Sequence, residues 1–178
     1  DIQMQFIPYS VESAEKRTLH SFPGMTIACF QLRPESLGSV HIRSNDPYEH
    51  PAIRFNFLSD PVDVRTNIDA VRMMREIVDG EPMDPYRDEE FYPGKSVSSD
   101  DEIEQFLREE CETGYHPMGT CRMGSGPNAV VNDQLKVRGL EGLRVADASI
   151  FPTMPSGNTN APCIMVGEKA ADLIKNTL

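Results

Sequence analysis

Apolar and polar residues alternate along the first third of the chain with the two-residue period of β-strands. The alternation is regular in residues 2–6 and 52–58, and residues 24–33 and 38–44 are short runs rich in β-branched and aromatic side chains. Clusters of proline, glycine and asparagine separate these runs and predict turns. We therefore expect an antiparallel sheet of four strands or more within residues 1–58.

The period lengthens to that of a helix in the middle of the chain. Segment 59–80 opens with a helix-capping residue, carries a proline in its first turn and ends on a glycine, which are usual signals of helix ends. Segment 98–112 repeats the design, with Ser99 and Glu102 spaced as a capping box. The polar, proline-rich segment 81–96 is expected to form a surface loop. The expected buried faces are Val64, Ile68, Val71 and Ile77 or Val78 in the first helix, and Ile103, Phe106 and Leu107 in the second.

Residues 114–178 are dense in glycine, proline, asparagine and serine, and they carry few charges until their end. We expect a short buried strand over residues 143–149 and a final helix over residues 161–178. The packing residues expected in this last helix are Ile164, Met165 and Leu173. The whole pattern predicts an α+β fold. Residues 1–113 would form an antiparallel sheet with helices packed on one face, and residues 114–178 a tail and a helix.

Composition and charge narrow the possible partners. The 178 residues carry a net charge of −11, which repels phosphate groups, so nucleic acids and anionic membranes are not expected as partners. No apolar run approaches the ~20 residues of a membrane-spanning helix. The chain opens in what looks like the middle of a strand, without an initiator methionine or a basic leader. We therefore expect it to be a piece of a longer protein.

The four cysteines are widely spaced and form no C-x-x-C pair. This spacing predicts neither a disulfide scaffold nor a zinc knuckle, and it favours reduced thiols and a cytoplasmic location.

The segment GYHPMGTCRMG, residues 114–124, holds one of the four histidines. His116 could be a metal ligand beside Cys121, the partner of a nucleophile, a lone general base or a loop histidine. No second ligand pair accompanies His116 and Cys121 to complete a zinc site, and no carboxylate is evident to orient a cysteine–histidine pair. We therefore predict no metal site, and these residues alone favour a loop histidine over a general base.

The segment GSGPNA, residues 124–129, formally matches the dinucleotide-binding pattern G-x-G-x-x-G/A. That pattern functions between a strand and a helix, so that a pyrophosphate lies at the helix N-terminus. Here a loop precedes the segment, an extended stretch follows it, and Pro127 removes one amide. We predict that the chain contains no phosphate-binding βαβ unit of its own.

Three motifs in the last third carry a resemblance to a known family. They are HPMGTCRMG at 116–124, GLRVADASIFPTMPSGNTNAP at 142–162 and GEKAADLI at 167–174. In this order and spacing they resemble the C-terminal part of the glucose–methanol–choline oxidoreductases, in particular the choline dehydrogenase-like alcohol dehydrogenases. The resemblance extends through most of the chain, including the opening strand and the segment that begins at Gly38.

The resemblance implies roles for two residues in oxidation of a primary alcohol to an aldehyde. His116 matches the family's catalytic histidine, which accepts the hydroxyl proton of the alcohol. Asn158 matches the position of a second active-site residue, which is asparagine in some members and histidine in others. An amide there can donate a hydrogen bond to the developing alkoxide without competing for the proton.

The resemblance also implies that FAD is the cofactor of the intact enzyme. Asp147 and Ala148 match a segment near the flavin's ribityl-phosphate region, and Thr159 and Asn160 match positions near its pyrimidine edge. An FAD-binding domain upstream of this chain would be the main partner, beside a small alcohol substrate. The chain alone is then expected to lack FAD and activity. It is also expected to expose apolar tail residues and to self-associate through them, namely Met118, Met123, Phe151 and Met154.

Three other functions stay open at this point. The chain could be a separate subunit that completes an active site in trans, or a non-catalytic binding module that kept the fold. It could also be a cysteine- or zinc-dependent hydrolase, which would require thiol or metal reactivity.

Overall fold

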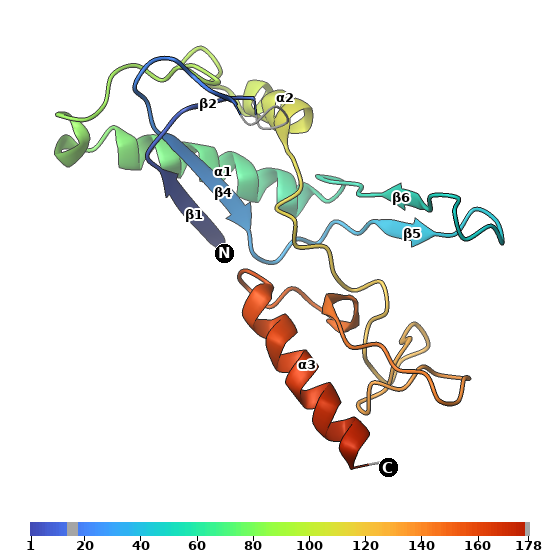
Figure 1. The fold of residues 1–178 in the computed structure, drawn as a ribbon. Coiled ribbons are helices and arrows are strands. Elements are labelled where there is room, and N and C mark those ends of the chain that lie inside the picture. Colours follow the sequence, from blue (N-terminus) through green and yellow to red (C-terminus); the bar gives the residue numbers. More distant parts are fainter. Residues whose placement is uncertain (14–17, 177–178) are drawn as a thin grey trace. The chain divides into compact units, whose positions relative to one another are not determined.

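The computed structural model describes residues 1–13 and 18–176 of the chain (Figure 1). The chain forms two compact units. The first unit consists of residues 1–31 and 57–111, and the second consists of residues 32–56 and 112–178. The second unit contains both His116 and Asn158.

The first unit is built on a pair of antiparallel strands. β1 (Ile2–Ile7) pairs with β4 (Thr26–Gln31) in a register that sets Ile2 opposite Gln31. A second pair, β2 (Val11–Ser13) with β3 (Thr18–Leu19), forms in the connection between them. The short β2–β3 pair has no clear signal in the sequence pattern.

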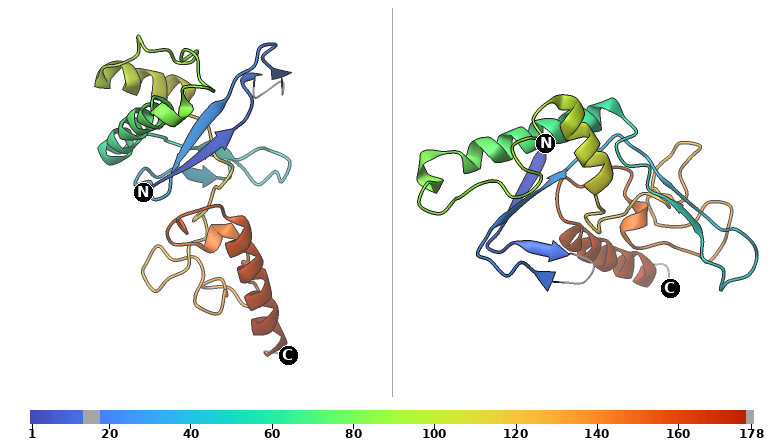
Figure 2. Two further views of the ribbon diagram at one scale, coloured as in Figure 1. Left: turned by 90° about the vertical axis from the view of Figure 1, so that its left-hand side faces the viewer. Right: turned by 90° about the horizontal axis from the view of Figure 1, so that it is seen from above.

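Helix α1 (Pro61–Val78) packs against β1 and β4 (Figures 1 and 2). It begins where the sequence predicts, because the Asp60 side chain accepts a hydrogen bond of 2.8 Å from the Val62 amide. Asp63 in its first turn is buried, and its Oδ1 accepts a hydrogen bond of 2.8 Å from Gln31 Nε2. This polar contact fixes the end of β4 against α1.

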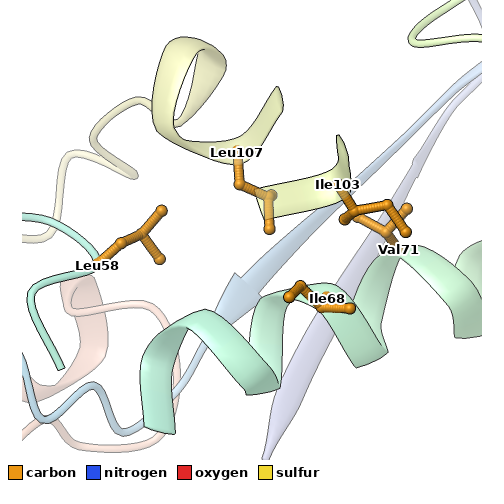
Figure 3. Packing of buried hydrophobic residues seen from close by; sticks show 5 residues of the cluster. All are labelled: Leu58, Ile68, Val71, Ile103 and Leu107. Carbon is orange, nitrogen blue, oxygen red and sulfur yellow. The ribbon is translucent and has the colours of Figure 1, made fainter. Parts of the chain in front are cut away.

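Helix α2 (Asp100–Glu110) closes the core of the first unit. Its predicted capping box is confirmed, since Ser99 and Glu102 bond each other's backbone amides. The buried residues come from α1, α2 and the segment before α1, as Figure 3 shows; they are Leu58, Ile68, Val71, Ile103 and Leu107. Val64 and Phe106 pack on this cluster, as predicted. Of the two alternatives for the last buried position of α1, Ile77 is half exposed and Val78 is half-buried.

The predicted surface loop between the helices contains a short 3₁₀ turn, η1 (Glu81–Met83), and is tied to α1 by one arginine. Arg75 donates to both carboxylate oxygens of Glu90, at 2.9 Å from Nε and 2.8 Å from Nη2. Its Nη1 donates to the Val97 carbonyl oxygen at 2.8 Å. Its Nη2 also donates to the Gly94 carbonyl oxygen at 3.2 Å, so Arg75 holds this polar surface segment at three residues.

The second unit has less regular structure. It contains the antiparallel pair β5 (Ser39–His41) and β6 (Ala52–Arg54), the 3₁₀ turn η2 (Ala148–Ile150) and helix α3 (Asn160–Lys175). Figure 2 shows α3 beside the segment that carries η2. The core of this unit is Val131, Leu135, Ile150, Val166 and Ala170.

The α+β fold class is confirmed, but the predicted single sheet is not. In the described residues the strands form three separate pairs instead of one sheet of four strands or more. The run 52–58 leaves the strand conformation after Arg54, since Asn56 and Leu58 have φ angles of 59° and 53°. Positive φ breaks the extended backbone, whatever the side-chain alternation.

Two expectations for the tail are wrong. Residues 143–149 form no strand: a single antiparallel bridge joins Arg144 to Lys136, and η2 follows. In α3, Leu173 packs on the core as predicted, but Ile164 and Met165 are 60% and 57% exposed. The buried face of this helix is formed instead by Val166 and Ala170.

The methionines and the phenylalanine expected to be exposed in the tail are partly buried; they are Met118, Met123, Phe151 and Met154. Met123 and Phe151 pack against the second core. The irregular chain of this unit folds over its own apolar side chains, which the sequence pattern did not predict. Among the described residues no helix is both long and apolar enough to cross a membrane.

Candidate functional site

The loop that carries His116 is fixed by backbone hydrogen bonds to η2. Three amides at alternate positions of the loop donate to three consecutive carbonyl oxygens, as in a short ladder. The pairs are Gly119 to Ala148 at 3.4 Å, Cys121 to Ser149 at 2.9 Å, and Met123 to Ile150 at 2.7 Å. Because Ile150 is buried in the core of the second unit, these bonds tie the histidine loop directly to that core.

The backbone next to His116 has an unusual conformation. Tyr115 has a φ angle of 59°, and its amide donates to Thr113 Oγ1 at 3.1 Å. Gly119 has a φ angle of 83°, and a Cβ added to it would lie 3.3 Å from the Phe151 carbonyl oxygen. A side chain at position 119 would therefore be strained and crowded.

His116 and Asn158 lie together, although 42 residues separate them in the sequence. Asn158 Nδ2 is 3.5 Å from His116 Nε2. The histidine is half-buried and the asparagine is exposed. The sequence resemblance selected these two residues independently of any contact between them.

The spacing of the two nitrogens suits a shared ligand oxygen. A hydrogen bond to oxygen spans about 2.7–3.2 Å, so one oxygen can lie within bonding distance of both nitrogens. An imidazole with a free Nε2 can accept a proton from that oxygen, and the amide can donate a hydrogen bond to it. This arrangement can remove a hydroxyl proton and stabilise the charge that develops.

Thr159 and Asn160 follow Asn158 directly and begin α3. Thr159 is buried and its carbonyl oxygen accepts a hydrogen bond of 2.9 Å from the Cys163 amide. Its side chain makes no capping hydrogen bond, and Pro162 lies in the first turn. Because the first amides of a helix carry partial positive charge, an N-terminus without a side-chain cap suits an electron-rich neighbour.

Asp147 and Ala148 lie in the segment whose carbonyl oxygens accept the hydrogen bonds from the histidine loop. Asp147 Oδ1 accepts a hydrogen bond of 2.8 Å from the Ser149 amide, so its carboxylate caps η2. The Ala148 carbonyl oxygen is the acceptor for Gly119. Ala148 is therefore hydrogen-bonded to the loop that carries His116. His116 in turn lies next to Asn158.

Sequence reasoning did not identify Tyr115 and Ser156, whose φ angles of 59° and 58° shape the backbone before His116 and Asn158. Neither is a glycine or an asparagine, the residues that usually signal positive φ. No local sequence signal could have found them.

The glycine-rich segment 124–129 does not lie between a strand and a helix, which the dinucleotide-binding pattern requires. Its residues form turns in which the Gly124 amide donates to the Val131 carbonyl oxygen at 3.2 Å. Arg138 Nη2 donates to the Gly124 carbonyl oxygen at 2.6 Å. The next residues make isolated bridges, and no helix begins before η2.

The cysteines and the acidic residues are possible metal ligands or nucleophiles, and their arrangement in the described part of the chain bears on both roles. In residues 1–13 and 18–176, no three His, Cys, Asp or Glu side chains are arranged to hold a metal ion together. All four cysteines are free thiols. Burial raises the pKa of the Cys29 and Cys111 thiols, which disfavours the reactive thiolate form.

Sequence comparisons match the chain to one family of known oxidoreductases, the glucose–methanol–choline (GMC) oxidoreductases. The family model of the GMC oxidoreductases matches residues 34–167. An oxygen-dependent choline dehydrogenase of Chromohalobacter salexigens is 42% identical over 175 residues, which are 98% of this chain and 31% of the relative. The chain therefore spans about a third of the length of the curated relatives it matches.

Solved structures agree with the sequence comparison. Pyridoxine 4-oxidase from Mesorbium loti matches 89% of this chain and 31% of its own, with 29% identity and a TM-score of 0.82. An FAD-dependent oxidoreductase from Chaetomium thermophilum matches 86% of this chain and 27% of its own, with 33% identity and a TM-score of 0.80. This chain belongs to the GMC oxidoreductase family and corresponds to the C-terminal part of its members.

Proposed function

We propose that this chain supplies the substrate-side half of the active site in an FAD-dependent oxidoreductase that oxidises a primary alcohol to an aldehyde. The observation that carries the proposal is the 3.5 Å approach of Asn158 Nδ2 to His116 Nε2. The similarity to choline dehydrogenases supports a choline-like alcohol as the substrate. The FAD-binding domain would lie in the part of the enzyme outside this chain.

His116 acts as the general base in this proposal. Oxidation of an alcohol removes a hydroxyl proton and a hydride, and the protein must accept the proton. His116 Nε2 takes it, since the unprotonated nitrogen of a neutral imidazole is a proton acceptor. The electron pair left on oxygen then forms the carbonyl bond as the hydride leaves carbon.

Asn158 stabilises the same oxygen while its proton leaves. Its amide N–H donates to the developing alkoxide but accepts no proton, so it supports the base without replacing it. The two side chains therefore have separate roles at one atom.

FAD, when bound, supplies the ring that accepts the hydride. The residues of this chain that would hold it are Thr159 and Asn160, at the start of α3, and Asp147 and Ala148, at the start of η2. The uncapped N-terminus of α3 supports this assignment, because its partial positive charge favours an electron-rich neighbour. The Asp147 carboxylate caps η2, so we assign the contact near the ribityl-phosphate region to the backbone of this turn.

The test uses the complete oxidoreductase that contains this chain. We expect His116→Ala to lower the rate of flavin reduction by choline or another primary alcohol by about 10²–10⁴-fold, measured by stopped-flow absorbance. Bound FAD should stay at the wild-type level. His50→Ala, at an exposed histidine of the same unit, is the matched control and should keep the wild-type rate. A near-normal rate in His116→Ala would show that the base lies elsewhere.

A further inference from the structure

An arginine far away in the sequence contacts the segment that carries Asn158. Arg33 Nε donates a hydrogen bond of 2.7 Å to Ser156 Oγ, across 123 residues of chain. Both residues belong to the second unit, so the contact lies within one compact body. It connects the segment that leads into β5 to the segment that leads into α3.

The acceptor of this bond has a strained backbone. Ser156 has a φ angle of 58°, a conformation that is unfavourable for a residue with a side chain. Such a conformation persists only where surrounding contacts hold it. The bond from Arg33 is a contact of this kind, and a charged donor makes it stronger than a neutral one.

Only Gly157 separates Ser156 from Asn158. A glycine has no Cβ and adopts many backbone conformations, so it does not by itself fix the position of Asn158 relative to Ser156. The position of the Asn158 amide then depends on both ends of this short segment. On the far side Thr159 is buried and begins α3, and on the near side Arg33 holds Ser156.

We propose that Arg33 is a positioning residue for the reaction, acting through Ser156 to hold the Asn158 amide at its place beside His116. This inference rests on the proposed function, in which Asn158 donates to the substrate oxygen. A small displacement of a positioned donor can cost a large factor in rate, although the group itself is still present. Arg33 is exposed, and its bond to Ser156 joins the segment before β5 to the segment that carries Asn158.

The test compares four variants of the complete oxidoreductase: Arg33→Ala, Ser156→Gly, Asn158→Ala and the pair Arg33→Ala with Asn158→Ala. Ser156→Gly removes the hydroxyl acceptor while a glycine keeps the positive φ without strain. We expect Arg33→Ala and Ser156→Gly each to lower kcat roughly tenfold, with KM for the alcohol changed less than about twofold. In the Asn158→Ala background, Arg33→Ala should lower kcat by less than about twofold more. Arg43→Ala, at an exposed arginine of the same unit, is the control and should leave kcat unchanged.

A second measurement does not depend on activity. Hydrogen exchange of the peptide covering residues 154–160 should be faster in Arg33→Ala and Ser156→Gly than in the wild type, with exchange elsewhere unchanged. Unchanged exchange there would overturn the proposal, and so would an equal loss of kcat from Arg33→Ala with and without Asn158. If His116→Ala and Asn158→Ala both kept wild-type kcat, the proposed function would fail. Faster exchange in Arg33→Ala would then identify a purely structural tie and exclude the positioning role.

Discussion

Asn158 Nδ2 lies 3.5 Å from His116 Nε2 because other parts of the second unit fix the two short segments that carry these side chains. The histidine loop is bonded to η2, and the asparagine segment lies between Ser156 and the buried Thr159. Both segments are also held by contacts from far away in the sequence, the histidine loop by η2 and Ser156 by Arg33. The geometry of the pair therefore depends on contacts that are distant along the chain.

The first prediction concerns the joint effect of the two residues in the complete oxidoreductase. His116→Ala should lower kcat by about 10²–10⁴-fold and Asn158→Ala by about 10–10³-fold. Since the proposed function has both residues act on one oxygen, the double variant should lose less than the product of the two single losses. Steady-state kinetics of the four proteins measures this coupling. Fully multiplicative losses would mean that the residues act at separate atoms.

The second prediction concerns the pH profile. An imidazole must be unprotonated to accept a proton, so kcat of the wild type should fall on acidification. Asn158→Ala should keep this acid limb while turning over more slowly at every pH, because an amide does not titrate. His116→Ala should lose the limb. An unchanged acid limb in His116→Ala would assign the base to another residue.

The third prediction concerns Gly119. Its φ angle of 83° and the 3.3 Å distance from an added Cβ to the Phe151 carbonyl oxygen make alanine unfavourable there. Gly119→Ala should lower the free energy of unfolding by about 1–2 kcal/mol, measured by urea denaturation of this chain. Gly126→Ala is a matched control, since a Cβ there meets no atom within 4 Å. Equal stability of the two variants would contradict the described geometry of the histidine loop.

The fourth prediction concerns the capping box of α2. Hydrogen bonds from the backbone amides of Ser99 and Ser98, and from the Ser99 hydroxyl, hold the pKa of Glu102 below its ordinary value. The ionised carboxylate therefore contributes stability at pH values above the ordinary glutamate pKa. This contribution is lost as the pH falls through that value toward the lower pKa of the folded state.

Glu102→Gln isolates this effect, because glutamine keeps an acceptor oxygen but has no charge to lose. Its free energy of unfolding should depend less steeply on pH in the acid range than that of the wild type. Urea titrations at a series of pH values compare the two slopes. Parallel curves would show that ionised Glu102 adds nothing to the stability of α2.

The sequence alone determined the elements whose signals are local. Asp60, Ser99 and Glu102 mark helix ends through contacts with residues two or three positions away, so α1 and α2 could be predicted together with their buried faces. The glycine-rich segment at 124 could be rejected as a nucleotide site for the same reason, since the elements needed around it were absent from the pattern. The tail motifs were specific enough to indicate the family and to select His116 and Asn158.

The tertiary structure alone decided what depends on distant contacts. The alternation in residues 52–58 predicted a strand, but the chain turns at Asn56 and Leu58, where no glycine signals positive φ. Likewise Ile164 and Met165 have the apolar character of core residues, but the other face of α3 meets the second core. The hydrophobicity of a side chain indicates that its burial would be favourable, but it does not indicate which surface of the protein will cover it.

The meeting of His116 with Asn158, and of Arg33 with Ser156, is decided at the same level. These pairs are separated by 42 and 123 residues, and no periodicity or capping rule acts over such distances. The buried cluster that contains Ile150 anchors the histidine loop through its bonds to η2, and the bond from Arg33 holds Ser156. The sequence determined which side chains the protein contains, and the tertiary structure determined which of them lie side by side, because those contacts join segments far apart along the chain.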